Sequence, residues 1–306
     1  MGNESKFIWM DGELVEFDKA NVHFLTGALH YGAAVFEGIR AYRTDRGPAV
    51  FRLQDHVERL IESVRIFGFR DLTFTVEGVT DAILETTRVN GFEECYIRPL
   101  IYFNAGVATL NLDDGKPSLG IAVWEWKNYL GEEALSKGVR ANVSSITRLH
   151  PNASMTKSKI AGNYVNSILA KTESVRLGFD EAIMLDPQGY VAECTGENLF
   201  LVRRGRIITP STAPILEGIT RHSLFVIARD LGYEVLEQPV SRDQLYTAEE
   251  VFVCGTAAEV IGLNEIDFRR VGDGATGPIT KQIQKVFQDA IHGRDKRYDH
   301  WLTYVN

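Results

Sequence analysis

The sequence predicts a mixed α/β fold, partly α+β, divided into two domains. Short runs rich in β-branched and aromatic residues alternate with segments whose apolar residues recur at helical spacing. With 306 residues, 44% of them hydrophobic, the chain is long enough for two hydrophobic cores of ordinary size. A short glycine-containing connector at 129–135 is expected to separate a small domain over 1–128 from a large domain over 136–306.

The first domain opens with a predicted β-hairpin. Residues 7–10 and 13–17 are β-rich, and Asp11-Gly12 between them is typical of a type I′ turn. Because that turn matches the twist of the flanking strands, we expect the two runs to pair directly.

Two helices and two strands complete this domain. Apolar residues recur at helical spacing over 53–64 and again over 76–84. Arg59 lies off the first apolar stripe, a position typical of a solvated surface side chain. Strands are predicted over 95–103 and 119–126. Between them, the turn-rich segment 104–117 predicts a long loop of the kind that often carries binding residues.

The second domain alternates strands with helices. Lys159 stands just ahead of the first predicted helix, and Gly232 closes the second. The predicted helices cover 160–177, 219–231 and 279–291, and the predicted strands cover 139–146, 182–185, 198–202, 206–209, 233–238 and 250–254. A turn at 186–189 follows the second of these strands, and the next two form a hairpin.

Composition excludes several classes of protein. The formal net charge of −8 argues against a nucleic-acid partner, whose binding needs concentrated Lys and Arg. No signal peptide, myristoylation pattern or membrane-crossing run is found, so we expect a cytoplasmic protein without a membrane partner. Cys95, Cys194 and Cys254 are odd in number and widely spaced, which favours buried thiols over disulfides or a metal site.

Lys159 is the candidate for chemistry. A lysine becomes a nucleophile near neutral pH only where its charged form is disfavoured, and it then condenses with a carbonyl to give a Schiff base. Lys157 and Lys159 crowd one another in this segment, which adds to that effect. An isolated lysine usually lies on the solvated surface, so the assignment depends on the motifs around it.

Seven motifs, with this lysine in one of them, follow each other along the chain. They are His30-Tyr31-Gly32 to Val35-Phe36-Glu37-Gly38-Ile39-Arg40, His56-Val57-Glu58-Arg59-Leu60, Cys95-Tyr96-Ile97-Arg98-Pro99-Leu100, Lys159-Ile-Ala-Gly-Asn163-Tyr164, Glu193-Cys-Thr-Gly-Glu-Asn198, Leu216-Glu-Gly-Ile-Thr220-Arg221 and Gly255-Thr256-Ala257-Ala258. With them the chain resembles, over nearly its whole length, the fold-type IV pyridoxal 5′-phosphate (PLP) aminotransferases, and among these the branched-chain amino acid aminotransferases. The resemblance implies two α/β domains with the cofactor cleft between them.

The cofactor needs a phosphate anchor, a carboxylate at its pyridine nitrogen and a lysine. Gly218-Ile219-Thr220 opens a predicted helix, where free backbone N–H groups and the helix dipole favour a phosphate; a plain threonine N-cap is the alternative. By resemblance, Glu193 keeps the pyridine nitrogen protonated, and Tyr164 hydrogen-bonds the phenolic oxygen, although a solvated glutamate and a core tyrosine are the commoner roles. Two further phosphate contacts are implied, Arg59 and Thr256.

The resemblance also implies the reaction. Lys159 holds PLP, is displaced by the amino acid, and then moves the proton between the substrate α-carbon and the cofactor. Amides around Thr256-Ala257 would bind the α-carboxylate, and Arg98 the second carboxylate of glutamate or 2-oxoglutarate. The side-chain pocket would be walled by Tyr31, Phe36, Tyr96, Trp126 and Tyr129. The substrates implied are leucine, isoleucine and valine, with 2-oxoglutarate as acceptor.

One departure leaves alternatives open. Where the family usually has a Gly-x-Gly-x-x-Pro turn, this chain has Asn104-Ala-Gly-Val-Ala-Thr-Leu110, without the second Gly or the Pro. D-amino acid aminotransferases, (R)-selective amine transaminases and aminodeoxychorismate lyase share the fold and the lysine. A binding protein without activity is a further alternative, which the presence of the lysine and its partners disfavours.

An assembly of at least two subunits is expected, with a hexamer as an alternative. The family builds its sites at a subunit boundary. The segment 27–36 is rich in small and apolar residues, and Val107 to Leu110 is an apolar patch in a polar loop. We expect this loop and the Tyr31 region of one subunit to close the pocket of the other, with packing inside one subunit as the alternative.

Overall fold

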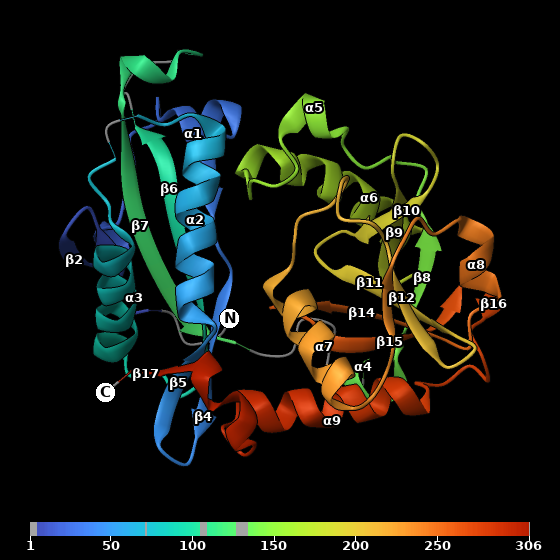
Figure 1. Cartoon of the computed structure of the whole chain (residues 1–306). Helices are drawn as coiled ribbons and strands as arrows, with labels where there is room; N and C mark the ends of the chain where they lie inside the picture. The colour runs from blue at the N-terminus through green and yellow to red at the C-terminus, as the bar shows by residue number, and fades with distance from the viewer. Residues whose placement is uncertain (1–4, 71, 105–108, 127–133, 306) are drawn as a thin grey trace. The chain divides into compact units, whose positions relative to one another are not determined.

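The computed structural model describes residues 5–70, 72–104, 109–126 and 134–305. The chain divides into two compact units, each with its own β-sheet (Figure 1). Unit 1 comprises Met1–Lys127, Ser158–Asn163 and Asp289–Asn306, and unit 2 comprises Asn128–Lys157 and Tyr164–Gln288. Most of the connector expected at 129–135, including Tyr129, lies outside the described residues. The segment with Lys159 thus belongs to the unit formed mainly by the first half of the chain.

Unit 1 is an antiparallel sheet with two helices packed against it. Its strands follow the order β17-β5-β4-β6-β7-β1-β2, and β3 also pairs with β6. The strands are β1 (Phe7–Met10), β2 (Glu13–Glu16), β3 (Ala34–Phe36), β4 (Ile39–Thr44), β5 (Gly47–Phe51), β6 (Cys95–Asn104), β7 (Lys116–Glu125) and β17 (Leu302–Tyr304). The helices α2 (Leu53–Phe67) and α3 (Val76–Asn90) lie side by side along the sheet (Figure 1).

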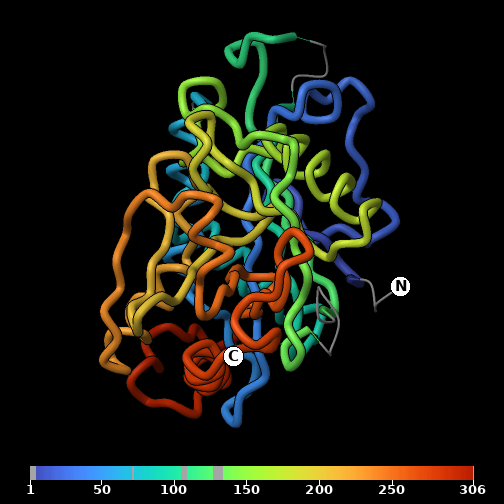
Figure 2. Tube along the Cα trace, turned by 90° about the vertical axis from the view of Figure 1, so that its right-hand side faces the viewer, coloured from blue at the N-terminus to red at the C-terminus, as the bar shows by residue number. Residues whose placement is uncertain are grey.

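The shorter helical segments of unit 1 lie outside this layer pair. They are η1 (Phe17–Lys19), α1 (Gly27–Tyr31), η2 (Leu112–Asp114), η3 (Ala161–Asn163) and η4 (Lys296–Trp301). The predicted first hairpin is confirmed, with both turn residues at positive φ, Asp11 at 47° and Gly12 at 107°. The β6–β7 pair runs further than predicted and shortens the expected loop; its end projects from the rest of unit 1 (Figure 2).

The hydrophobic core of unit 1 holds α2 against the sheet. The predicted stripe is confirmed, because Val57, Leu60 and Val64 are fully buried. They pack in one cluster with apolar residues of α3 and of the central strands, among them Ile83 and Ile97. Each such side chain contributes about 1.5–3 kcal/mol when buried, so the stripe fixes the helix on the sheet.

Unit 2 contains a mixed sheet. The order is β10-β9-β8-β15-β14-β11-β12-β13, with β16 beside β15; β8 runs parallel to both its neighbours, and β12 parallel to β13. The strands are β8 (Val139–Val143), β9 (Glu181–Leu185), β10 (Val191–Cys194), β11 (Asn198–Arg203), β12 (Arg206–Thr209), β13 (Val235–Glu237), β14 (Glu250–Gly255), β15 (Glu259–Ile266) and β16 (Arg269–Arg270). The helices are α4 (Ala134–Lys137), α5 (Pro151–Ser154), α6 (Tyr164–Arg176), α7 (Ile219–Asp230), α8 (Arg242–Tyr246) and α9 (Pro278–Ile291), the last of which continues into unit 1.

The start of the helix after Lys159 differs from the prediction. We expected it at residue 160, but α6 begins at Tyr164, after the 3₁₀ turn η3. Gly162 packs so closely on Gly32 that a Cβ at Gly32 would lie 2.7 Å from the Gly162 Cα. Ile160 is buried in the core of unit 1 instead of on the helix. Residues 160–162 are therefore packed against unit 1, and α6 begins only after them.

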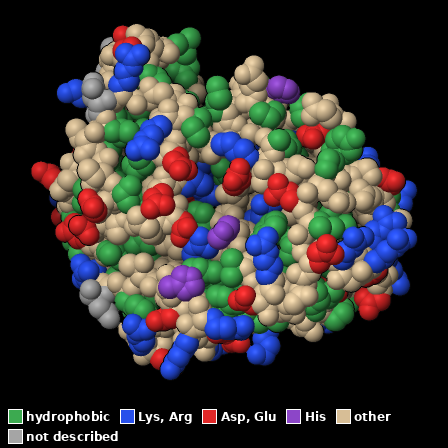
Figure 3. Space-filling view, viewed as in Figure 1, with side chains coloured by type: hydrophobic (Ala, Val, Ile, Leu, Met, Phe, Trp, Pro, Cys, Tyr) green, Lys and Arg blue, Asp and Glu red, His purple; other side chains and the backbone are tan. Residues whose placement is uncertain are grey.

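The surface shows mixed charge. On the face in Figure 3, Lys and Arg are interspersed with Asp and Glu, without a continuous basic stripe. In the described ranges, each helix is too short or too polar to span a bilayer. No group of His, Cys, Asp and Glu that could hold a metal ion is found among those residues.

Candidate active site

Lys159 lies in a segment of unit 1 with a fixed backbone. Its N–H donates to the Ser63 hydroxyl at 3.1 Å, and its carbonyl accepts from the Phe36 N–H at 3.1 Å. The neighbouring Ser158 hydroxyl donates to the Ser63 carbonyl at 3.0 Å. The Lys159 Nζ lies 5.2 Å from the centre of the Phe36 ring. Since Ser63 is buried in α2, the lysine is anchored to the packed helix and to β3.

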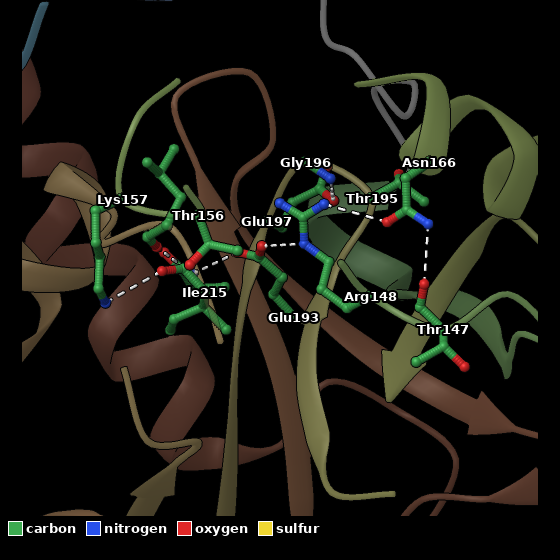
Figure 4. Close-up of polar contacts among 12 residues, drawn as sticks. Thr147, Arg148, Thr156, Lys157, Asn166, Glu193, Thr195, Gly196, Glu197 and Ile215 are labelled. Carbon is green, nitrogen blue, oxygen red and sulfur yellow. Dashed lines mark hydrogen bonds and ion pairs between the residues drawn. The ribbon is translucent and has the colours of Figure 1, made fainter. Parts of the chain in front are cut away.

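Lys157 is held very differently, in unit 2. Its ammonium donates to the Ile215 carbonyl at 3.3 Å (Figure 4). It also donates to the Thr212 carbonyl and pairs with Glu217 at 2.9 Å. These contacts hold the ammonium on two backbone carbonyls and one carboxylate. Lys157 is therefore a structural cation, and Lys159 is the better candidate nucleophile.

Arg59 is not the solvated residue that its helix position indicated. Its side chain is only 13% exposed, and Nε and Nη2 donate to the two Glu37 carboxylate oxygens at 2.6 and 2.8 Å. His56 Nδ1 lies 2.7 Å from the same carboxylate. The pattern missed this because Glu37 is 22 residues away, in the segment between β3 and β4. A bidentate carboxylate fixes the orientation of the guanidinium fork.

Burial and the neighbouring charges determine the protonation of Glu37 and His56. Burial opposes the Glu37 carboxylate, but Arg59 and His56 outweigh it and hold the pKa of Glu37 below its ordinary value. Burial, with Arg59 and Lys159 adding to it, lowers the pKa of His56 despite Glu37. His56 is therefore neutral at pH 7, and its Nδ1–H donates to Glu37.

Four of the residues predicted to contact the substrate lie together in unit 1: Phe36, Tyr96, Arg98 and Trp126. The Arg98 guanidinium lies 4.5 Å from the centre of the Phe36 ring, and its Nη2 is 3.3 Å from the Tyr96 hydroxyl. The Tyr96 and Trp126 ring centres are 4.6 Å apart. A Cβ at Gly38 would lie 1.9 Å from the Tyr96 hydroxyl oxygen, so only glycine admits that ring.

Arg98 also has unused hydrogen-bonding capacity. Its Nε is buried and has no hydrogen-bond partner among the described residues. Tyr31, at the end of α1, is exposed and contacts the ring of His30 instead of this group. Tyr129 is outside the described residues. A cation among aromatic rings can contact both an apolar side chain and a carboxylate.

Glu193 is buried on β10 of unit 2, although a glutamate next to a turn is more often solvated. Arg148 Nε donates to its Oε1 at 2.7 Å (Figure 4). Asn198 Nδ2 donates to its Oε2 at 3.3 Å. Arg148 in turn donates to Asn166 at 3.2 Å, whose amide donates to the Thr147 carbonyl at 2.9 Å. Sequence reasoning missed Arg148, which lies 45 residues away in an irregular segment.

The N-terminus of α7 has the features that a phosphate site needs. Gly218 is the N-cap residue and no side chain caps the helix, so the alternative of a threonine N-cap is wrong. The first N–H groups of a helix lack intrahelical acceptors, and Ile219 and Thr220 supply two of them. A Cβ at Gly218 would lie 2.0 Å from the Asn198 Oδ1, which explains the glycine.

Asn198 connects the parts of the unit 2 site. Besides Glu193 it donates to the Leu216 carbonyl at 3.1 Å, and its backbone pairs with Cys254. Thr256 and Ala257 follow directly at the end of β14. Tyr164 opens α6 with a half-buried side chain. The carboxylate, the segment before α7 and the end of β14 are therefore all connected to one residue, Asn198.

Comparisons with known proteins give one consistent result. The family model described as amino-transferase class IV matches residues 34–266. The chain is 42% identical over 305 residues to the branched-chain-amino-acid aminotransferase of Pseudomonas aeruginosa, covering 100% of this chain and 99% of the relative. It is similar to the T.th. branched-chain amino acid aminotransferase with pyridoxamine 5′-phosphate, with a TM-score of 0.96, 48% identity and 99% of each chain covered. For the Escherichia coli branched-chain amino acid aminotransferase the TM-score is 0.94 at 40% identity, covering 99% of this chain and 100% of that one.

Proposed function

Because the chain belongs to the class IV aminotransferase family, we propose that it transfers the amino group of leucine, isoleucine and valine to 2-oxoglutarate, with PLP as cofactor. The products are the 2-ketoacids and glutamate. The observation that carries this proposal is Arg98 among the rings of Phe36 and Tyr96. Such a site accepts an apolar side chain in one half-reaction and the second carboxylate of glutamate in the other. We propose the cytoplasm as the compartment of this reaction.

The residues present fit PLP. The free N–H groups at the start of α7 suit a phosphate, and the buried Glu193 carboxylate suits a protonated pyridine nitrogen. Arg59 and Thr256 are proposed as further phosphate ligands, Tyr164 as the partner of the phenolic oxygen, and Ala257 as a ligand of the substrate carboxylate. When bound, the cofactor supplies an electron sink that makes the substrate α-hydrogen acidic.

The chain's own residues supply the rest of the chemistry. Lys159 Nζ would hold the cofactor through its carbonyl and, once the substrate amine has taken its place there, would be free to take the proton from the substrate α-carbon. Its anchored backbone limits the positions that the amine can reach. Glu193 holds a negative charge at the ring nitrogen, and Arg148 fixes the orientation of that carboxylate.

Substrate tests decide between this function and its alternatives. The purified protein with PLP should form glutamate from 2-oxoglutarate with L-leucine, L-isoleucine and L-valine, and much more slowly with D-alanine or an (R)-amine. Faster transfer from the D-amino acid or the amine would reassign the substrate class. Pyruvate release from aminodeoxychorismate without an amino acceptor would identify a lyase.

Glu37→Gln should weaken cofactor binding. The substitution keeps the side-chain shape but removes the charge that holds Arg59 in its bidentate orientation. We expect the dissociation constant of PLP to rise on the order of tenfold, corresponding to about 1.4 kcal/mol. The measurement is fluorescence quenching of the cofactor-free protein, repeated with inorganic phosphate as competitor. Glu58→Gln, an exposed position on the same helix as Arg59, is the matched control; equal constants in both variants contradict the role of Glu37.

We propose a homo-oligomer of at least two subunits, supported by exposed apolar side chains on both units. Phe24 is 72% exposed next to α1, and Leu110 is 83% exposed at the end of the loop expected to reach a partner. Val107, the other end of that patch, lies outside the described residues. On α6 the predicted apolar stripe faces solvent, and Ile168 and Leu169 are each more than half exposed. Exposed apolar surface of this kind favours a subunit interface.

Dilution tests this assembly. Sedimentation should show a dimer or larger species wherever the protein is active, and activity should fall as the species dissociates. Phe24→Ser should shift dissociation to higher protein concentration, because it removes apolar area from the interface. A fully active monomer would rule out completion of one subunit's pocket by another.

A further inference from the structure

Three buried carboxylates gather around the turn that joins β10 to β11. Glu193 lies in β10 before this turn, Glu197 lies after it, and Glu181 comes from the neighbouring strand β9. Consecutive backbone amides of the turn bind two of them. The Thr195 N–H donates to Glu181 at 3.3 Å. The Gly196 N–H donates to Glu197 at 3.0 Å, and Figure 4 shows both of these residues.

Two of these carboxylates have a cation. Glu193 pairs with Arg148 at 2.7 Å, and Glu181 pairs with Lys171 of α6 at 2.5 Å. Glu181 also accepts from the Thr195 hydroxyl at 2.6 Å. Both charges are therefore compensated inside the protein.

Glu197 has no cation of its own among the described residues. Within the described ranges its carboxyl group is bound only through Oε2, by the Gly196 N–H, and the residue is 4% exposed. Three carboxylates facing two cations would leave one negative charge unbalanced and buried, at a cost of several kcal/mol. Gly255 packs against this residue: a Cβ there would lie 3.1 Å from the Gly196 carbonyl and 3.6 Å from the Glu197 Cγ.

We propose that Glu197 is a positioning residue held as a neutral carboxylic acid. Its proton leaves two negative charges facing two cations, so that Glu193 stays ionised and paired with Arg148. The inference rests on the proposed function for the last part of this role, in which Glu193 faces the pyridine nitrogen. The proton is carried on Oε1, since Oε2 accepts the Gly196 N–H.

The groups that face Glu197 agree with this assignment. Burial, then Glu181, with a smaller contribution from Glu193, raise the pKa of Glu197 to about 8, against the opposing effects of Lys171 and the Gly196 N–H. The thiols on the adjoining strands stay neutral, because burial raises the pKa of both Cys194 and Cys254.

This proton makes stability depend on pH in a definite direction. In the unfolded chain the Glu197 carboxyl ionises around its ordinary value of 4.5, whereas in the folded protein it keeps the proton to about pH 8. Folding therefore takes up a proton in that window, and the contribution of Glu197 to stability falls as pH rises. Glu197→Gln keeps the neutral shape and removes this fall.

Thermal unfolding of the full chain without added cofactor tests whether Glu197 is protonated in the folded protein. The melting temperature of Glu197→Gln minus that of the wild type should become more positive by several degrees from pH 5 to pH 8. Glu58→Gln, an exposed position in α2, is the control, and its melting temperature should follow that of the wild type over this pH range. A difference for Glu197→Gln that stays flat with pH overturns the proposal. If that variant does not fold, infrared spectra of the wild type decide: a protonated carboxyl band should be present at pH 7 and lost above pH 8, and its absence at pH 7 also overturns the proposal.

The pH titration of the bound cofactor's visible absorbance tests the positioning role. The wild type should show a step near pH 8, as Glu197 ionises beside Glu193, and Glu197→Gln should lack it. Superimposable titrations overturn the positioning role. A protein that binds no PLP refutes the proposed function instead, and the melting data then still report on the proton.

Discussion

Lys159→Ala should abolish transamination and the visible absorbance of the bound cofactor. The variant loses both the amine that binds the cofactor carbonyl and the base for the α-proton, so the rate should fall about 10⁴-fold or more. Steady-state kinetics with L-leucine and 2-oxoglutarate, together with the absorbance spectrum, measure both effects.

Lys157→Ala is the matched control. This lysine is 39% exposed and pairs with Glu217, an interaction worth about 0–1 kcal/mol at such a site. We expect a small fall in melting temperature, with the absorbance and rate close to wild type. The assignment of the two lysines is reversed if Lys157→Ala loses the absorbance and Lys159→Ala keeps it.

Local patterns were enough to predict most of the framework. The α2 stripe with Val57 and Val64, and the Asp11-Gly12 turn, depend on neighbours within a few residues, and both are confirmed. No strand was predicted where β15 forms, although it lies in the middle of the unit 2 sheet. Gly262 interrupts its apolar run because Thr276 packs there, where a Cβ would lie 2.8 Å from the threonine hydroxyl. That packing partner is not apparent from the local sequence.

In the candidate site too, residues in local motifs were predicted and partners distant in sequence were not. Lys159 and Glu193 were assigned through motifs, whose residues are contiguous in the chain. The groups that control their surroundings come from far away: Arg148 reaches Glu193 across 45 residues, and Glu37 reaches Arg59 across 22. An ion pair of this kind leaves no periodic signal in either segment. Pattern reasoning therefore finds the reacting groups more readily than the residues that hold them.

Glu193→Gln should separate cofactor binding from catalysis. The proposed phosphate ligands, Arg59 and Thr220, are untouched, so PLP should still bind. A neutral amide no longer holds a proton on the ring nitrogen, and the proton transfer should slow by several orders of magnitude. The dissociation constant of PLP and the single-turnover rate with L-leucine measure the two effects separately.

A second variant shows whether the Glu193 charge or its orientation by Arg148 controls the rate. Arg148→Met removes the cation and leaves Glu193 in place, so its carboxylate loses the 2.7 Å hydrogen bond that orients it. We expect a smaller rate loss than in Glu193→Gln, because the negative charge at the ring nitrogen remains. Near-normal turnover in Glu193→Gln would show that this carboxylate does not serve the ring. A greater loss in Arg148→Met than in Glu193→Gln would assign the controlling charge to the arginine instead.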